Sequence, residues 1–377
     1  MRWLLVLLLA LLTGPLAAQG EPKPVYYGVW KGTVGTYPVI ACMDQDGLGK
    51  ARGAYYYVSH LTPIGLAGRD DGPDWDEAVD YAASGARWHA VAVKGDVLWA
   101  SWVQGGKTLP VRLARQTWTG GEEFDGPCMG DAFIAPRAGG GSVASADASF
   151  DGVAYRKLTY VPGKQFGENG SIETLALLSD APGDKAINAL LARDLPDGGW
   201  RSDFIQCLSF EVANSGSDGY FGLTVEPDLI TGRWLDLTIG NENSCGGVHP
   251  NAWSSFRTFD RQSGAEVNLF RWLNAKAVEH VAGDKPEDGY DKLLPPLRDL
   301  TLEYASADAG DADPDCPAAT RDAEFWYLGL AKDGLQLIPS LPHVIQACAD
   351  SYVVPWRALA PYLSDEGKAG AAVLRAG

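Results

Sequence analysis

The chain has 377 residues and a formal net charge of −17 at pH 7, from 31 Lys and Arg against 48 Asp and Glu. Such a surface repels nucleic acid, because proteins bind phosphate backbones through Lys and Arg contacts. It would attract a basic protein, although acidic surfaces also serve solubility alone, and we take solubility as the default reading. At about 150 residues per domain, this length predicts two or three domains.

Residues 1–18 have the pattern of a secretory signal peptide. Arg2 supplies the positive start, residues 3–12 are apolar, and small residues precede a cleavage site that we place after Ala18. The apolar run is shorter than the roughly 20 residues that cross a bilayer, and no later segment is long and apolar enough. We therefore expect a periplasmic or secreted protein without a transmembrane span.

Six cysteines in an exported chain argue for disulfides, and six allow 15 pairings. The simplest pairing joins neighbours along the chain, which would fasten three local units. The spacing contains no Cys-x-x-Cys, so redox catalysis and a structural zinc site are not expected. The candidate pairs are Cys42 with Cys128, Cys207 with Cys245, and Cys316 with Cys348.

Residues 25–137 predict a small antiparallel β module, either a sheet or a barrel. Residues 88–93 and 97–102 are strand-like and flank Lys94-Gly-Asp96, which is a hairpin cue. Turn residues recur every eight to twelve positions or so, as in small barrels. The many Trp and Tyr residues here could line a sugar-binding groove, but we favour sheet and core positions for them. Asp74, Asp76 and Glu77 beside Trp75 are expected to form a solvated loop.

Residues 138–149 are rich in Gly, Ala and Ser and predict an inter-domain linker. An α+β domain is expected over residues 150–363, with an antiparallel sheet and one or two packed helices. Its first helix is marked by Asp180 as the cap and by Ile187, Leu190 and Leu191 on one face. Residues 200–212 fit a helix or a strand. Residues 364–377 are expected to be a frayed tail.

The stretch Cys245-Gly-Gly-Val-His-Pro-Asn251 is the strongest candidate for a functional loop. The glycines Gly246 and Gly247 permit a sharp turn, and exposed loops carry function. His249 follows at once and is the best functional candidate among the five histidines. The alternative, which we favour, is a histidine whose ring hydrogen-bonds the backbone and locks the turn.

The order of motifs after residue 150 resembles the RsiV-like domain of bacterial extracytoplasmic proteins. The motifs are a helix, a strand, Gly246-Gly-Val-His249, Phe259-Asp-Arg-Gln-Ser-Gly264, Val267-Asn-Leu269, Phe325-Trp-Tyr-Leu328, Asp333-Gly-Leu-Gln-Leu-Ile338 and Val353-Val-Pro-Trp-Arg-Ala-Leu359. The resemblance covers about residues 150–363. This chain has Cys245 and Val248 where the family has an aromatic residue and Ala, and Pro342-His343 where Pro-Tyr is typical.

That family forms the lysozyme-sensing outer part of RsiV-type anti-sigma factors, so the resemblance implies a lysozyme-like partner. The chain has no transmembrane span and no sigma-binding segment, so we do not expect an anti-sigma factor. The binding residues we expect are Gly246, Gly247, His249, Asn251 and His343.

Catalytic motifs were not found. The chain has no Gly-x-Ser-x-Gly, no His-Glu-x-x-His and no Walker A loop, and none of its histidines has another His or Cys at ligand spacing. We therefore expect no metal, no cofactor and no catalytic residues. Our leading hypothesis is an exported, non-enzymatic binding protein of the bacterial envelope, with a lysozyme-like protein or a cell-wall glycan as ligand. The alternatives are an enzyme acting on cell-wall glycan and a structural envelope protein.

Overall fold

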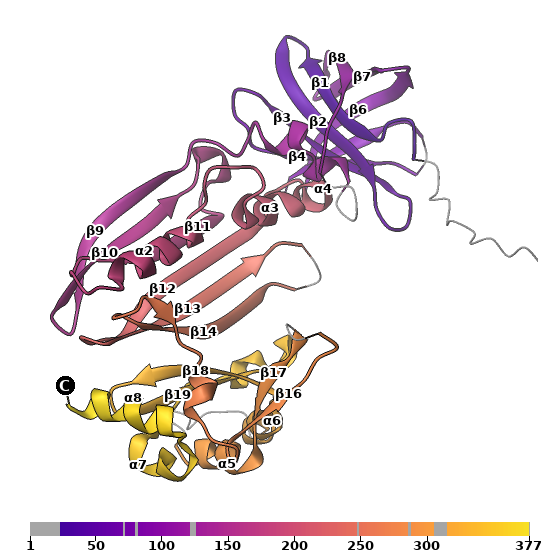
Figure 1. Ribbon diagram of the computed structural model, residues 1–377. Coiled ribbons are helices and arrows are strands. Elements are labelled where there is room, and N and C mark those ends of the chain that lie inside the picture. The colour runs from indigo at the N-terminus through magenta and orange to yellow at the C-terminus, as the bar shows by residue number, and fades with distance from the viewer. Residues whose placement is uncertain are drawn as a thin grey trace, which may run out of the picture.

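The computed structural model describes residues 23–376 except 71, 80–81, 121–125, 247–248, 286–287 and 305–314. These residues form an eight-stranded barrel, a seven-stranded sheet and a C-terminal unit built on a three-stranded sheet. Figure 1 shows the seven-stranded sheet between the other two parts. The α+β class with an N-terminal antiparallel β module is confirmed. The signal peptide expected at residues 1–18 lies outside the described residues.

The barrel is closed because β1 pairs with both β2 and β8, with Val34 opposite Val111 in the second pair. Trp30, Tyr55 and Trp88 are buried in its interior, so these aromatic residues are core residues as expected. Closure leaves no unpaired edge among the described strands of the barrel. The strands are β1 (Gly28–Val34), β2 (Tyr37–Gln45), β3 (Ala51–Tyr57), β4 (Ile64–Gly68), β5 (Trp75–Val79), β6 (Ala82–Lys94), β7 (Val97–Gln104) and β8 (Lys107–Gln116).

The acidic cluster near Trp75 is not a solvated loop, and that expectation was wrong. Residues Trp75–Val79 form β5, which pairs with β4 and β6. Glu77 is buried, and both the Tyr55 hydroxyl and the Trp102 indole N–H donate to its Oε1 at 2.7 Å. Burial raises the pKa of Glu77, and these hydrogen bonds work against that rise. The hydrogen-bond donors inside the barrel make an inward position for the carboxyl possible.

The central sheet has the order β15-β14-β13-β12-β11-β10-β9, and the β11–β12 pair alone is parallel among these described strands. Helices α2 and α3 cover one face, where Ile187 and Leu191 pack on Val225 and Leu237. The elements are β9 (Ser142–Phe150), β10 (Val153–Val161), β11 (Gly170–Leu177), α2 (Asp184–Leu191), α3 (Asp203–Phe210), α4 (Val212–Ser215), β12 (Tyr220–Ile230), β13 (Trp234–Ser244), β14 (Asn251–Asp260) and β15 (Ala265–Glu266).

Three sequence-based assignments are settled by these elements. Residues 142–149 of the expected linker lie in strand β9, because small Ala and Ser side chains do not prevent backbone pairing with β10. The ambiguous segment at 200–212 is helical, and the Ser202 side chain accepts a hydrogen bond from the Ile205 N–H at its start. The expected frayed tail is instead helix α8 (Asp365–Ala376).

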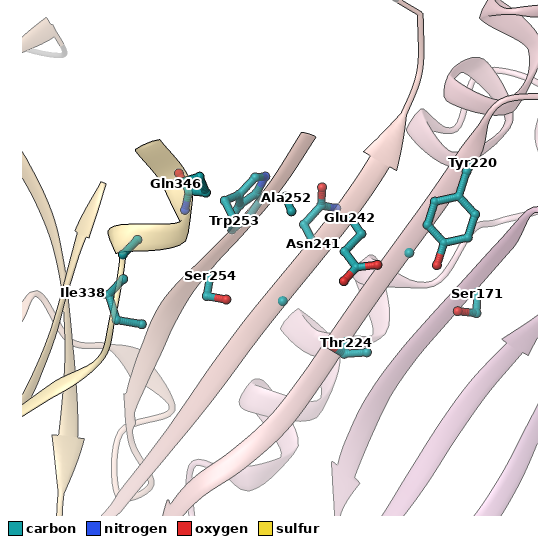
Figure 2. A pocket seen from close by; sticks show the side chains of 13 residues that line it. Ser171, Tyr220, Thr224, Asn241, Glu242, Ala252, Trp253, Ser254, Ile338 and Gln346 are labelled. Atoms are coloured by element: carbon teal, nitrogen blue, oxygen red, sulfur yellow. The ribbon is translucent and has the colours of Figure 1, made fainter. Parts of the chain in front are cut away.

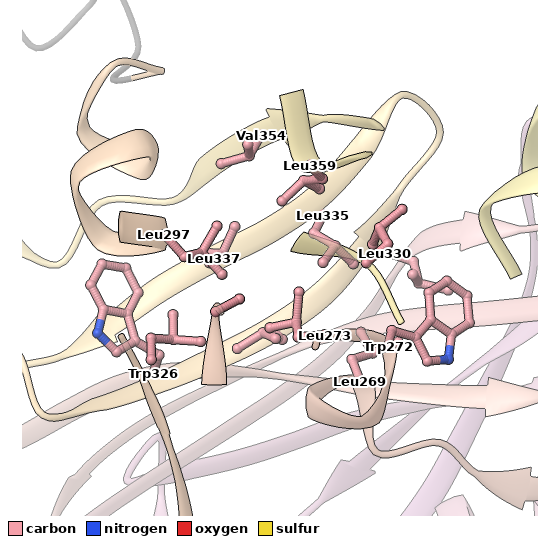
Figure 3. Packing of buried hydrophobic residues seen from close by; sticks show 14 of the residues in the cluster. Leu269, Trp272, Leu273, Leu297, Trp326, Leu330, Leu335, Leu337, Val354 and Leu359 are labelled. Carbon is pink, nitrogen blue, oxygen red and sulfur yellow. The ribbon is translucent and has the colours of Figure 1, made fainter. Parts of the chain in front are cut away.

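The C-terminal unit is held by a core of Leu and Trp side chains from its sheet and surrounding helices, as Figure 3 shows. Helix α8 packs closely on Trp272, because a Cβ at Gly370 would lie 2.3 Å from its ring. This contact explains why the tail is ordered. The other elements are β16 (Val278–Val281), β17 (Tyr290–Leu293), α5 (Pro295–Leu302), α6 (Cys316–Asp322), β18 (Phe325–Ala331), β19 (Gly334–Ser340), β20 (Tyr352–Pro355) and α7 (Trp356–Leu359).

All three neighbour pairings of the cysteines are confirmed: Cys42–Cys128, Cys207–Cys245 and Cys316–Cys348. Disulfides persist in oxidising compartments, so the protein is extracytoplasmic. Among the described residues, no helix combines the length and apolar character needed to cross a membrane.

The barrel joins the sheet through a short segment after β8 that contains α1 (Asp131–Ile134). Arg137 ends this segment and is fully buried. Its Nη2 donates to both carboxylate oxygens of Asp218, at 2.6 and 2.7 Å, and its Nε donates to the Leu61 carbonyl of the barrel at 2.8 Å. The guanidinium also lies 5.7 Å from the Tyr56 ring centroid and 5.2 Å from that of Phe166. One side chain therefore contacts the barrel, the sheet and the segment between them.

We predict that Arg137→Met lowers the free energy of unfolding by about 3–5 kcal/mol, because it leaves the Asp218 carboxyl buried without its partner. The measurement is urea unfolding followed by fluorescence and circular dichroism. Arg156→Met is the matched control, since the Arg156–Asp147 pair is exposed and such pairs contribute roughly 0–1 kcal/mol. Equal losses for the two variants would contradict the importance of the buried pair.

Candidate functional site

The face of the central sheet opposite α2 and α3 is hollowed at one end into a groove of about 370 Å³. Its floor comes from positions that lie opposite one another in the β12–β13 and β13–β14 pairs and therefore share one face. The lining side chains come from the neighbouring strands β11, β12, β13 and β14 and from the C-terminal unit, as can be followed in Figure 2. The floor positions are Gly222, Thr224, Gly240, Glu242, Ala252 and Ser254.

The small side chains of these residues leave open space above the strands. Gly222 and Gly240 lie inside strands, where glycine often marks a place that a ligand or another backbone approaches closely. A Cβ at Gly240 would lie 2.7 Å from the Thr224 hydroxyl. The rest of the floor offers hydroxyls and one carboxylate, so it can donate and accept hydrogen bonds.

The two walls of the groove differ in origin. Tyr220 stands on one side, where its hydroxyl lies over Gly222, and its side chain is partly exposed. Ile338, Gln346 and Ala349 of the C-terminal unit form the other side. Gln346 lies in the 3-10 helix η7 (His343–Cys348), and Ala349 directly follows it. The groove therefore lies at the boundary between the central sheet and the C-terminal unit.

The same row of positions continues under the C-terminal unit, where it is covered. Along β13, Asp236 and Thr238 precede Gly240 and Glu242 at every second position. Asp236 is fully buried, beneath Gly329 of β18, and accepts a hydrogen bond from the Thr258 hydroxyl. Burial raises the pKa of Asp236 well above its ordinary value, and the Thr258 hydrogen bond only partly offsets that rise.

The predicted loop at 245–251 joins β13 to β14 at the open end of the groove. The Cys207–Cys245 disulfide ties its first residue to α3. Gly246 has a φ of 96°, and a Cβ there would lie 2.0 Å from the Phe210 ring, so this position requires glycine. Gly247 and Val248 lie outside the described residues.

The structure brings two of the predicted binding residues together. The His249 and His343 rings stack, with centroids 5.4 Å apart and an interplanar angle of 17°. Both residues are exposed. His249 is three residues before Ala252 and His343 is three before Gln346, both of which line the groove. The pair therefore connects the sheet to the C-terminal unit near the groove. Asn251 is exposed at the start of β14, opposite Asn243, and does not line the groove.

Sequence reasoning missed the groove itself, including Tyr220, Thr224, Glu242 and Ser254. The available signal was the alternation in β12–β14, where one face is apolar and the other carries Gly, Thr, Ser and Ala. The alternation indicated strands. The in-strand glycines were the feature that pointed to a site.

These features define an extracytoplasmic, disulfide-bonded α+β protein with a groove on an open sheet face. No protein-family model matches the chain, and no curated protein matches it. A solved structure of a DUF3298 family protein from Pseudomonas aeruginosa PAO1 covers 60% of this chain and 94% of its own, at 13% identity and a TM-score of 0.34. A DUF3298 family member from Bacteroides fragilis NCTC 9343 covers 63% and 97%, at 12% identity and a TM-score of 0.37.

We predict that Asp236 makes the protein more stable at low pH. Folding raises the pKa of this carboxyl, so its contribution is fully present below the ordinary value of about 3.9 and is lost as the pH rises through the raised folded value. The difference in unfolding free energy between the native protein and Asp236→Asn should fall by about 1.36 kcal/mol per pH unit in that window.

The measurement is urea unfolding of both proteins from pH 4 to pH 7. Glu242→Gln removes a carboxylate from the exposed end of the same strand and controls for the change in net charge. If the difference in unfolding free energy between the native protein and Asp236→Asn stays constant over this range, the prediction is contradicted.

Proposed function

We propose that this protein is an exported, non-enzymatic binding protein that holds an extended polar ligand, a cell-wall glycan, in the groove of its central sheet. The observation that carries the proposal is the composition of the groove. Its glycine-containing floor allows close approach, and Thr224, Ser254 and Glu242 offer hydrogen-bonding groups. Tyr220 adds an aromatic wall against which a sugar ring can pack.

The size of the groove supports the same ligand class. Small-molecule sites usually have volumes of about 300–1,000 Å³ and bury most of their ligand. The groove is near the lower limit at about 370 Å³ and is open at its end, which suits a short run of a longer polymer.

Binding is favoured over catalysis by the charges in the groove. Glycoside hydrolysis in most families uses two carboxylates that flank the scissile bond. Among the residues that line the groove, Glu242 is the one carboxylate. The alternative, an enzyme acting on cell-wall glycan, would need a second acid from elsewhere.

The test is calorimetric titration of the mature protein with peptidoglycan-derived oligosaccharides, with product release followed in parallel. We predict saturable binding without hydrolysis, and at least a tenfold loss of affinity in Ala252→Trp, whose side chain would occupy the exposed floor. Ala154→Trp introduces the same ring at an exposed position on β10 and should bind normally. Hydrolysis would favour the enzyme. Equal binding by both variants would mean that the ligand binds outside the groove.

A basic, lysozyme-like protein is a second candidate ligand, supported by a different set of observations. The chain has a net charge of −17, so a basic partner would be steered toward it. Val344 and Ile345, which follow His343, are exposed by 87% and 37%. Exposed apolar residues beside a polar groove are typical of protein-binding surfaces. The resemblance to RsiV-like domains implies the same partner.

For this candidate, we predict tight binding of a c-type lysozyme that survives near-physiological salt and is not shared by an equally basic unrelated protein. Val344→Ser should weaken the binding several-fold, because it removes an exposed apolar contact without changing charge. Leu48→Ser, at a 95% exposed position in the barrel, is the matched control. Binding that disappears with salt, or that the control protein shares, would mean that non-specific charge attraction explains the interaction. Failure of both ligands would favour a structural envelope protein.

A further inference from the structure

Strand β9 is the outer strand of the central sheet, and Figure 1 shows it at the margin of the molecule. It pairs with β10 along all nine residues, from Phe150 opposite Val153 to Ser142 opposite Val161. No described strand pairs with its other side. Its outer edge therefore presents a row of backbone N–H and C=O groups that another strand could pair with. The opposite edge of the sheet differs, because β15 has two residues.

Proteins usually protect such an edge with Lys, Pro, bulges or a very short strand. Strand β9 has none of these protections. It contains neither Lys nor Pro, and its pairing with β10 runs without a register shift. Seven of its nine residues are exposed, and most are Ala or Ser. Asp147 is its single charged residue and forms an ion pair with Arg156 of β10 at 3.3 Å. The edge is long, regular and almost neutral in a chain of net charge −17.

The sequence of β9 is also self-complementary. When two copies pair antiparallel and use all nine residues, the two-fold axis passes through Ala146, and Ser142 of one copy lies opposite Phe150 of the other. Asp147 then lies opposite Ser145, whose hydroxyl can donate to it, and not opposite a second carboxylate. A two-fold axis at Asp147 would place like charges directly opposite, which is destabilising. The register with its axis at Ala146 therefore pairs the full length of β9 and also keeps the two Asp147 carboxylates from lying opposite each other.

We propose that two copies of this protein associate through antiparallel pairing of β9, so that their seven-stranded sheets form one continuous sheet. Such an interface is isologous, since each copy uses the same residues. The groove lies at the other side of the sheet and on the C-terminal unit, so both grooves stay open in the dimer. This inference does not depend on the proposed ligand.

The association is reversible. A single strand pair with small side chains buries less than the roughly 1,200 Å² of a standard stable interface. The two negative net charges also repel, and salt screens that repulsion. The dimer therefore forms at high protein concentration and is favoured by moderate salt.

The first test is sedimentation velocity of the mature protein over a wide range of concentration. We expect a shift from monomer toward dimer, which Ala146→Lys abolishes because it places two positive charges at the two-fold axis. Leu48→Lys makes the same change in net charge at a 95% exposed barrel position and should still dimerise. A native protein that stays monomeric throughout, or a dimer that Ala146→Lys retains, would overturn the proposal.

The second test measures the register. In the proposed pairing, the Ala146→Cys residues of the two copies lie directly opposite, within the Cα separation of about 4.4–6.8 Å that a disulfide requires. The Ser142→Cys residues lie eight positions apart, or roughly 26 Å at 3.3 Å per residue. We expect rapid oxidative cross-linking of the first variant and slow cross-linking of the second. Equal rates would mean random collision and would overturn the β9 interface.

Discussion

The buried contact between Arg137 and Asp218 determines how the barrel is attached to the rest of the protein. Arg137 lies at the end of the segment that leaves the barrel, and Asp218 lies just before β12, the first strand of the groove floor. A charge pair whose side chains are only 0% and 3% exposed requires good geometry, because both charges have lost most of their water. Close to this pair, Gly65 of β4 and Gly216 after α4 meet backbone to backbone, which admits no Cβ on either side.

The groove follows from the way the central sheet is covered. Helices α2 and α3 cover one face completely enough to form an apolar core, while the C-terminal unit covers part of the other. The exposure of this face rises along β13 over four alternate positions, from the buried Asp236 to the exposed Glu242. The uncovered part carries small and polar residues, so it can remain in contact with water without an apolar penalty. The groove is therefore the portion of a sheet face that the next unit leaves open.

The sequence predicted the fold where the signal was local. The barrel hairpin at Lys94-Gly-Asp96 and the neighbour pairing of the cysteines depend on residues or spacings within one unit, and the structure confirms them. Two of the errors came from contacts between residues far apart in the sequence. Glu77 is buried because Tyr55 and Trp102 donate to it, and the tail is helical because Trp272 packs on Gly370. Likewise, the stacking of His249 on His343 joins segments whose proximity no local pattern indicates.

The order of the disulfides has a consequence for biogenesis. The three bonds span 86, 38 and 32 residues, and none encloses or crosses another. In a chain that reaches an oxidising compartment from its N-terminus, each cysteine meets its partner before the next pair arrives. Bonds formed in order of emergence are then the native ones, and little isomerisation is required. The barrel can be covalently tied to the segment that follows it before the central sheet has been delivered, so maturation can proceed one unit at a time.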